Sequence, residues 1–128
     1  MSYEEIMIYQ NTIRKKDRSE LETLYLIFRR YNLMVCMIND SYDKGEYDDK
    51  EYLKRRKQLY LEQINENTYH LVNKNKEELK RIVNAVKTYK GSLTFEKALA
   101  YNYITALKNI EVDKNLRKVR YLICQKIN

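Results

Sequence analysis

Residues 19–41, SELETLYLIFRRYNLMVCMINDS, are predicted to form the helix around which the rest of the chain packs. Spacings of three and four residues place one set of side chains on a single helical face. That set comprises Leu21, Leu24, Tyr25, Phe28, Asn32, Val35 and Asn39. A second apolar row contains Leu26, Leu33 and Met37, with Ile27 and Met34 beside it. Because a helix that is apolar nearly all round is either buried centrally or shared with a partner chain, we expect both rows to be hidden from water.

The composition favours helices over sheets. The 128 residues include no proline and only two glycines, Gly45 and Gly91. Sheet-rich domains need turn-forming residues at short intervals, and this chain lacks them. With 44% apolar and 34% charged residues, the chain is long enough to bury a core and too apolar for a disordered protein. We therefore expect one all-α domain over residues 1–128.

Four pairs of residues have the spacing of a capping box, in which a short polar side chain starts a helix and a glutamate three residues later reaches back to it. The pairs are Ser2 and Glu5, Ser19 and Glu22, Asp48 and Glu51, and Asn75 and Glu78. Each pair lies at the start of an apolar-periodic segment. Gly45, in the short link before Asp48, is expected to close the central helix, so that the flanking helices are antiparallel neighbours.

These signals divide the chain into a bundle of five or six helices around a central apolar helix at about residues 20–41. The other helices are expected at about residues 3–16, 49–72, 76–90, 95–110 and 114–127, with Asp113 capping the last one. Asparagines weaken the second half of the helix at 49–72, and we place its end at a break over residues 73–75. The alternative is one continuous helix from Asp49 to Lys90.

The net charge is +7, from 25 lysines and arginines against 18 aspartates and glutamates. This excess favours an anionic partner, whether nucleic acid, an acidic protein surface or anionic lipid, without choosing among them. The longest apolar run, residues 33–38, is far too short to span a membrane, and the N-terminal residues lack the pattern of a secretory signal. Because Cys36 and Cys124 stand alone in helical apolar patterns, we expect buried, reduced thiols in a cytoplasmic protein.

Residues that carry metal or catalytic chemistry are few. A twelve-residue calcium loop counted from Asp40 has glycine at its sixth position and glutamate at its twelfth, but Tyr42 and Lys44 occupy positions that need oxygen donors. The single histidine, His70, has no cysteine or histidine at metal-ligand spacing. The serines lie at expected helix ends, where capping explains them. We expect no metal, no cofactor, no small-molecule substrate and no enzymatic activity.

Two basic clusters are candidates for contact with nucleic acid or an acidic partner. Residues 54–57, KRRK, splay around their helix, and Lys57 falls on its apolar stripe, where its stem can lie along the core. On the last helix, cations share a face with an aromatic ring able to stack on a base. The candidate contact residues are Lys54, Arg55, Arg56, Lys114, Arg117, Lys118 and Tyr121. The alternative is that both clusters are ordinary solvated faces.

The chain has 13 tyrosines, a residue enriched at protein interfaces because it combines an apolar ring with a polar tip. Three follow core stripes and are expected to pack inside: Tyr25, Tyr60 and Tyr103. Six are candidates for a contact surface: Tyr31, Tyr42, Tyr47, Tyr69, Tyr101 and Tyr121. Tyrosines also close the edges of helical cores, so their number alone identifies no site.

These observations favour a non-enzymatic protein-interaction module, such as an adaptor, a complex subunit or an inhibitor. The expected interface is the second row of the central helix with the arginine between its members: Leu26, Arg30, Leu33 and Met37. Its partner would be another protein or a second copy of this chain. The alternative is a nucleic-acid-binding protein that uses the helix at residues 114–127 and the cluster at residues 54–57.

The composition also bears on origin. Lysine, asparagine, isoleucine and tyrosine, which have A/T-rich codons, are abundant, whereas proline, glycine, alanine and tryptophan are scarce or absent. We therefore expect an A/T-rich genome, such as that of a low-GC bacterium, its phage or plasmid, or a large DNA virus. The coding sequence tests this expectation directly.

Overall fold

Five α-helices and no strand make up the part of the chain that this computed structural model describes, residues 18–88 and 95–127, with side chains at 20–86 and 95–116. The helices are α2 (Arg18–Asp43), α3 (Asp49–Gln63), α4 (Glu66–Lys74), α5 (Lys76–Thr88) and α6 (Phe95–Ile127). The predicted all-α bundle is confirmed. The helix expected at about residues 3–16, with its cap Ser2, lies outside the described residues.

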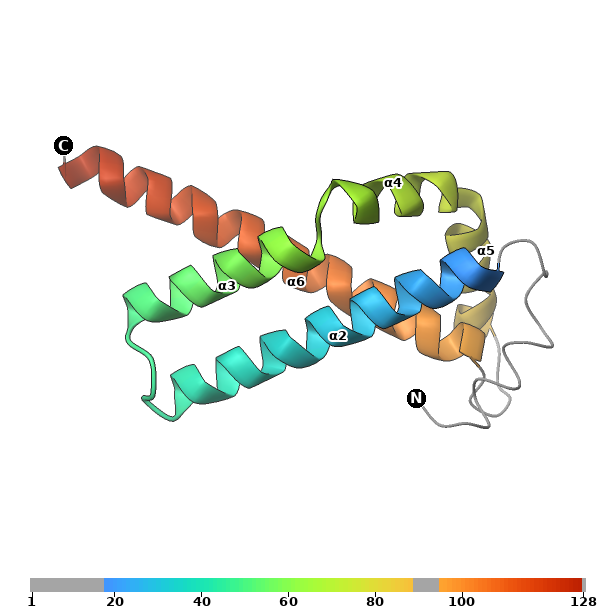
Figure 1. The fold of residues 1–128 in the computed structure, drawn as a ribbon, viewed down its shortest axis with the longest axis horizontal. Coiled ribbons are helices and arrows are strands. Elements are labelled where there is room, and N and C mark those ends of the chain that lie inside the picture. The colour runs from blue at the N-terminus through green and yellow to red at the C-terminus, as the bar shows by residue number, and fades with distance from the viewer. Residues whose placement is uncertain (1–17, 89–94, 128) are drawn as a thin grey trace.

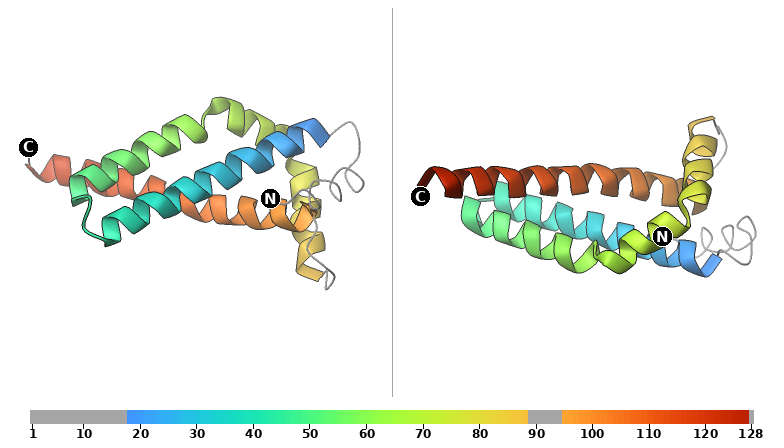
Figure 2. Two further views of the ribbon diagram at one scale, coloured as in Figure 1. Left: turned by 60° about the horizontal axis from the view of Figure 1, so that its bottom comes forward. Right: turned by 90° about the horizontal axis from the view of Figure 1, so that it is seen from above.

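The bundle is elongated, with α2 and α3 forming an antiparallel hairpin and α6 packing across both (Figure 1). After a bend, α4 continues beyond the end of α3, and α5 turns away at that end of the bundle. Seen from above, α6 lies along one side of the hairpin, and α5 projects further toward that same side (Figure 2). Neither α5 nor α6 therefore covers the opposite side of the hairpin.

The turn between α2 and α3 forms as its sequence predicts. Gly45 has a φ of 79°, a conformation that glycine adopts without strain, and its amide donates to the Tyr42 carbonyl at 3.0 Å. The Asp48 side chain then accepts from the Glu51 amide at 2.8 Å and starts α3. The Glu51 side chain does not reach back to Asp48 as a capping box predicts; it pairs with Arg55 at 2.9 Å and stabilises the following turn of the helix. The predicted antiparallel pairing of the two helices is confirmed.

The core is built around one face of α2, as predicted. Leu21, Leu24 and Phe28 are almost completely buried there, and Tyr25 packs against Phe95 with ring centroids 4.7 Å apart. Asn32 is buried on the same face and donates to the Asn102 carbonyl of α6 at 2.9 Å. Tyr31 and Val35 of α2 also belong to the core. Its further residues come from α3, the bend after α3, α5 and α6: Leu59, Tyr60, Ile64, Leu79, Ile82, Leu99, Ala100, Ala106 and Ile110.

The single helix expected at residues 49–72 is interrupted, and this prediction is wrong in its middle. The Asn65 side chain accepts from the Thr68 amide at 3.1 Å and caps α4, so that α3 ends at Gln63. The predicted break at residues 73–75 is confirmed, because α4 ends at Lys74 and α5 starts at Lys76. A continuous helix to Lys90 is therefore excluded.

The two helices expected at residues 95–110 and 114–127 are one helix, α6. The predicted N-cap, Asp113, lies in its interior and is only 2% exposed. Aspartate is neither a good interior helix residue nor easily buried, and its presence here has to be explained by a tertiary partner. That partner is Arg56 of α3.

Candidate protein-binding face

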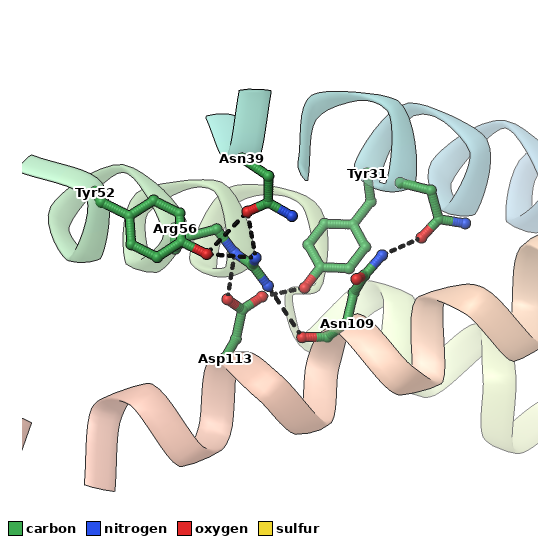
Figure 3. Close-up of polar contacts among 7 residues, drawn as sticks. Tyr31, Asn39, Tyr52, Arg56, Asn109 and Asp113 are labelled. Atoms are coloured by element: carbon green, nitrogen blue, oxygen red, sulfur yellow. Dashed lines mark hydrogen bonds and ion pairs between the residues drawn. The ribbon is translucent and has the colours of Figure 1, made fainter. Parts of the chain in front are cut away.

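A cluster of polar side chains lies buried where α2, α3 and α6 meet (Figure 3). The Arg56 Nε donates to Asp113 Oδ1 at 2.8 Å, and the two side chains are 3% and 1% exposed. The Tyr31 hydroxyl donates to the other carboxylate oxygen of Asp113. Side chains of α2 and α3 therefore meet at a single carboxylate of α6.

Both Nη atoms of Arg56 also donate hydrogen bonds. Its Nη1 donates to the Asn39 side-chain oxygen at 3.1 Å and to the Tyr52 hydroxyl at 3.2 Å, and its Nη2 donates to the Asn109 carbonyl at 3.4 Å. Tyr52 in turn donates to Asn39 at 2.8 Å. A buried charge is tolerated when it is paired and hydrogen-bonded in this way.

The cluster shifts the titration of its members. Burial raises the pKa of the Tyr31 hydroxyl well above its ordinary value, and the hydrogen bond to Asp113 raises it further, so Tyr31 stays a neutral donor. Burial lowers the pKa of the Arg56 guanidinium, but the hydrogen bond and charge of Asp113 together hold that pKa above its ordinary value.

The cluster corrects two sequence-based predictions. Arg56 was expected to contact a partner and Tyr31 to lie on a contact surface, but both are buried, at 2% and 0% exposed. The apolar periodicity of residues 54–57 predicts that Lys57 is the buried member, but Lys57 is exposed. The prediction fails because a carboxylate across the bundle decides which residue is buried, and local periodicity contains no information about it. These side chains hold the three helices together and are not available to an external ligand.

The second row of α2 is open to water. Leu26, Leu33 and Met37 are 57%, 52% and 68% exposed, so the expectation that this chain hides both rows of α2 is wrong. The three residues lie opposite the core face, and each keeps more than half of its surface exposed. Central burial of both rows within the described part of the chain is therefore excluded.

Two adjoining depressions follow this row. A hollow of about 440 Å³ is lined by Leu26, Arg29, Arg30, Leu33 and Met34. A groove of about 270 Å³ between α2 and α3 begins at the same methionine and continues along Met37 and Ile38, with Leu59 of α3 among its lining residues. We call the α2 residues around the row the α2 outer face: Leu26, Arg29, Arg30, Leu33, Met34, Met37 and Asp40.

Charged groups lie at both ends of the α2 outer face. Arg29 and Arg30 are exposed near one end, and Asp40 is exposed at the other, followed by Asp43. Among the described residues, no side chain forms a hydrogen bond or an ion pair with any of these four. Cys36, expected to be buried, is an exposed free thiol on the flank of this face.

The other predicted contact residues lie on two helices, α3 and α6. Lys54 is exposed, whereas Arg55 is held by Glu51 at 2.9 Å and lies over the Tyr47 ring at 4.4 Å. Lys114 is exposed on α6. The side chains of three further candidates lie outside the described residues: Arg117, Lys118 and Tyr121.

The tyrosines divide in part as predicted. Tyr25 and Tyr60 are buried, and Tyr103 is half-buried against Phe28. Tyr69 and Tyr101 are exposed, while Tyr42 stacks on Tyr52 at the turn. They do not gather on the α2 outer face.

A further groove, which the sequence did not indicate, lies between α5 and α6. Its volume is about 280 Å³, and Lys76 and Lys80 contribute to a lining that is otherwise mostly apolar, with Leu107 47% exposed. The α5 residue Val83 and the α6 residue Ile104 also line it. The crossing of α5 over α6 creates this groove, and no local pattern predicts that crossing.

A scan of protein-family models and searches of curated proteins and of solved structures find nothing that matches this chain. Within the described helices, no segment combines the length and apolar character that a membrane crossing requires.

Proposed function

We propose that this chain is a protein-interaction module that binds a helix of its partner along the α2 outer face. The exposure of Leu26, Leu33 and Met37, on a helix whose other side forms the core, carries this proposal. Single exposed apolar residues are ordinary, but a row of three beside a groove is typical of a binding surface.

The spacing of the row favours a helix as the bound element. Leu26, Arg30, Leu33 and Met37 follow one another at intervals of four, three and four residues, which is the alternation of a coiled-coil seam. At a rise of about 1.5 Å per residue, the row extends over about 17 Å, roughly three turns of a helix. The methionines of the adjoining groove suit such an interface because their side chains adapt to an irregular surface.

Replacement of Leu33 by aspartate tests this proposal. A carboxylate in the middle of the row would have to be desolvated by the partner, so Leu33→Asp is expected to weaken binding by about 100-fold or more. The measurement is capture of partners by the tagged chain from the cells that encode it, with nuclease treatment to remove nucleic-acid bridges.

The matched control is Leu61→Asp. Leu61 is also 52% exposed, but it lies on the outer side of α3 and lines neither depression. This variant is expected to retain the captured protein, and circular dichroism should show native helix content in both variants. Capture of the same proteins by wild type and Leu33→Asp would contradict the proposal.

A second candidate function is nucleic-acid binding, which one observation supports. Lys50, Lys54 and Lys57 are exposed at intervals of four and three residues along the outer side of α3. No ion pair within the described part of the chain neutralises them. A stripe of free cations of this kind can follow a phosphate backbone.

A further inference from the structure

We infer that the helix bound by the α2 outer face is α2 of a second copy of this chain, packed antiparallel about a two-fold axis that crosses the outer face at the level of Val35. This inference rests on the proposed function and adds the identity of the partner. Its basis is that the apolar and the charged residues of the face match those of the same face on a second copy whose α2 runs in the opposite direction.

The charges of the face are separated along α2. Arg30 lies five residues before Val35, and Asp40 lies five residues after it. At about 1.5 Å per residue, the two are about 15 Å apart along one helix, too far to pair within one chain. Among the described residues, the side chain of neither forms a hydrogen bond or an ion pair, so both charges are available to a partner.

Reversal of a second copy brings these charges together. A two-fold axis at the level of Val35 places Arg30 level with Asp40 of the second copy, and the symmetry forms this pair twice. The same axis places Leu33, two residues before Val35, level with Met37 of the second copy, two residues after it. This register pairs Leu33 with Met37 and Arg30 with Asp40 of the second copy, while Leu26 falls level with Lys44, just beyond the end of α2.

The flank of the face agrees with this register. Arg29, Cys36 and Asp43 are seven residues apart and therefore lie on one side of α2. A two-fold axis perpendicular to both helices brings this flank against the same flank of the second copy. Arg29 then lies within one turn of Asp43 of the second copy, and the two Cys36 thiols lie near the axis.

A parallel pairing is disfavoured by the same residues. It would place Arg30 beside Arg30 and Asp40 beside Asp40, and like charges at facing positions repel. The contact along α2 is short, so we expect a dimer whose population depends on protein concentration. Because its ion pairs lie at the ends of the contact, near solvent, high salt should weaken it.

Charge reversal at the paired positions tests the inference. Sedimentation equilibrium of the full chain is expected to show a dimer for wild type. Arg30→Asp and Asp40→Arg, each of which sets like charges against each other, should raise the dimer dissociation constant by about tenfold or more. The double variant Arg30→Asp with Asp40→Arg restores opposite charges and should bring that constant back to within about threefold of wild type.

Cross-linking at Cys36 tests the register independently. In a Cys124→Ser variant, a short bis-maleimide should join two chains through Cys36, because the register brings both thiols close to the axis. The additional change Leu33→Asp should abolish the cross-linked product, whereas Leu61→Asp should leave it unchanged.

The outcomes separate this inference from the proposed function. A wild-type chain that stays monomeric at the highest measurable concentration overturns the inference. If that monomer captures another protein and Leu33→Asp releases it, the proposed function stands and the partner is not a second copy. A dimer that Leu33→Asp dissociates but the charge pairs do not affect overturns the antiparallel register. A dimer that Leu33→Asp leaves intact overturns the inference as a whole.

Discussion

Arg56 and Asp113 show how a small helical protein accommodates a full charge in its core. Each would be strongly unfavourable there alone, but Asp113 accepts from Arg56 and Tyr31, and the Nη atoms of Arg56 donate to residues of α2, α3 and α6. Buried pairs of this kind often contribute little net stability compared with apolar residues of the same volume. We therefore assign the pair a role in fixing how α6 lies against the hairpin.

Removal of the charge on one partner should be strongly destabilising. Asp113→Asn leaves the Arg56 guanidinium buried without a counter-charge, so we expect it to lower the free energy of unfolding by about 3–5 kcal/mol. Urea denaturation followed by circular dichroism measures this change.

The control for this prediction is Glu111→Gln in the same helix. Glu111 is exposed, and its neutralisation should change the free energy of unfolding by less than about 0.5 kcal/mol. Replacement of both buried partners, Arg56→Met with Asp113→Leu, should recover part of the loss. Equal stability of Asp113→Asn and Glu111→Gln would show that the pair is not coupled to folding.

At the scale of the element, α4 depends on its surroundings more than any longer helix does. It has only nine residues, and isolated helices of that length are not stable in water. Its start is held by Asn65, which accepts from the Thr68 amide at 3.1 Å and donates to the Glu62 carbonyl at 3.1 Å. These contacts turn the chain between α3 and α4.

Loss of this cap should have a measurable effect. Asn65→Ala removes the acceptor for the Thr68 amide, so we expect the free energy of unfolding to fall by about 1 kcal/mol. Asn67→Ala, in the first turn of the same helix and exposed, should stay within about 0.5 kcal/mol of wild type. A shift of the urea midpoint in both variants alike would argue against capping by Asn65.

Local signals of the sequence predicted those elements whose causes are local. The apolar spacing of residues 19–41 predicted the core face of α2, and Gly45 and Asp48 predicted the turn that follows. Prediction from the sequence failed where a residue far away in the chain determines whether a side chain is buried. From its local sequence Asp113 is expected to be a helix cap, and only its contact with Arg56 across the bundle explains its burial. Similarly, the exposure of Leu33 depends on where α6 and α5 pack. The start of α4 was missed because Asn65 is one of several asparagines with similar local signals.

At the scale of the whole molecule, the net charge of +7 is spread over several surfaces. Lys50, Lys54 and Lys57 lie on the outer side of α3, whereas Lys76 and Lys80 line the groove between α5 and α6. Diffuse positive charge attracts any polyanion weakly, so the question for nucleic acid is whether one stripe dominates.

The lysine stripe of α3 can be tested against that background. If it contacts phosphates, replacement of Lys50, Lys54 and Lys57 by glutamine should reduce the slope of log binding constant against log salt by up to about 0.9 per lost contact. Electrophoretic retardation of DNA and RNA over a salt series measures this slope.

The control replaces Lys76, Lys80 and Lys108 by glutamine, which lowers the net charge equally at another surface. If both triple variants lose affinity to the same extent, the attraction is diffuse and the stripe is not a site. Absence of retardation at low salt would eliminate nucleic-acid binding as a function.

The buried arginine also has a consequence for the order of events during synthesis. Asp113 follows Arg56 by 57 residues. The α2–α3 hairpin therefore leaves the ribosome well before the carboxylate that neutralises the Arg56 guanidinium. Until α6 emerges, the guanidinium must stay hydrated, so the inner surface of the nascent hairpin cannot bury it. Arrival of Asp113 is then the step that allows this surface to dry, which couples completion of the core to translation of α6.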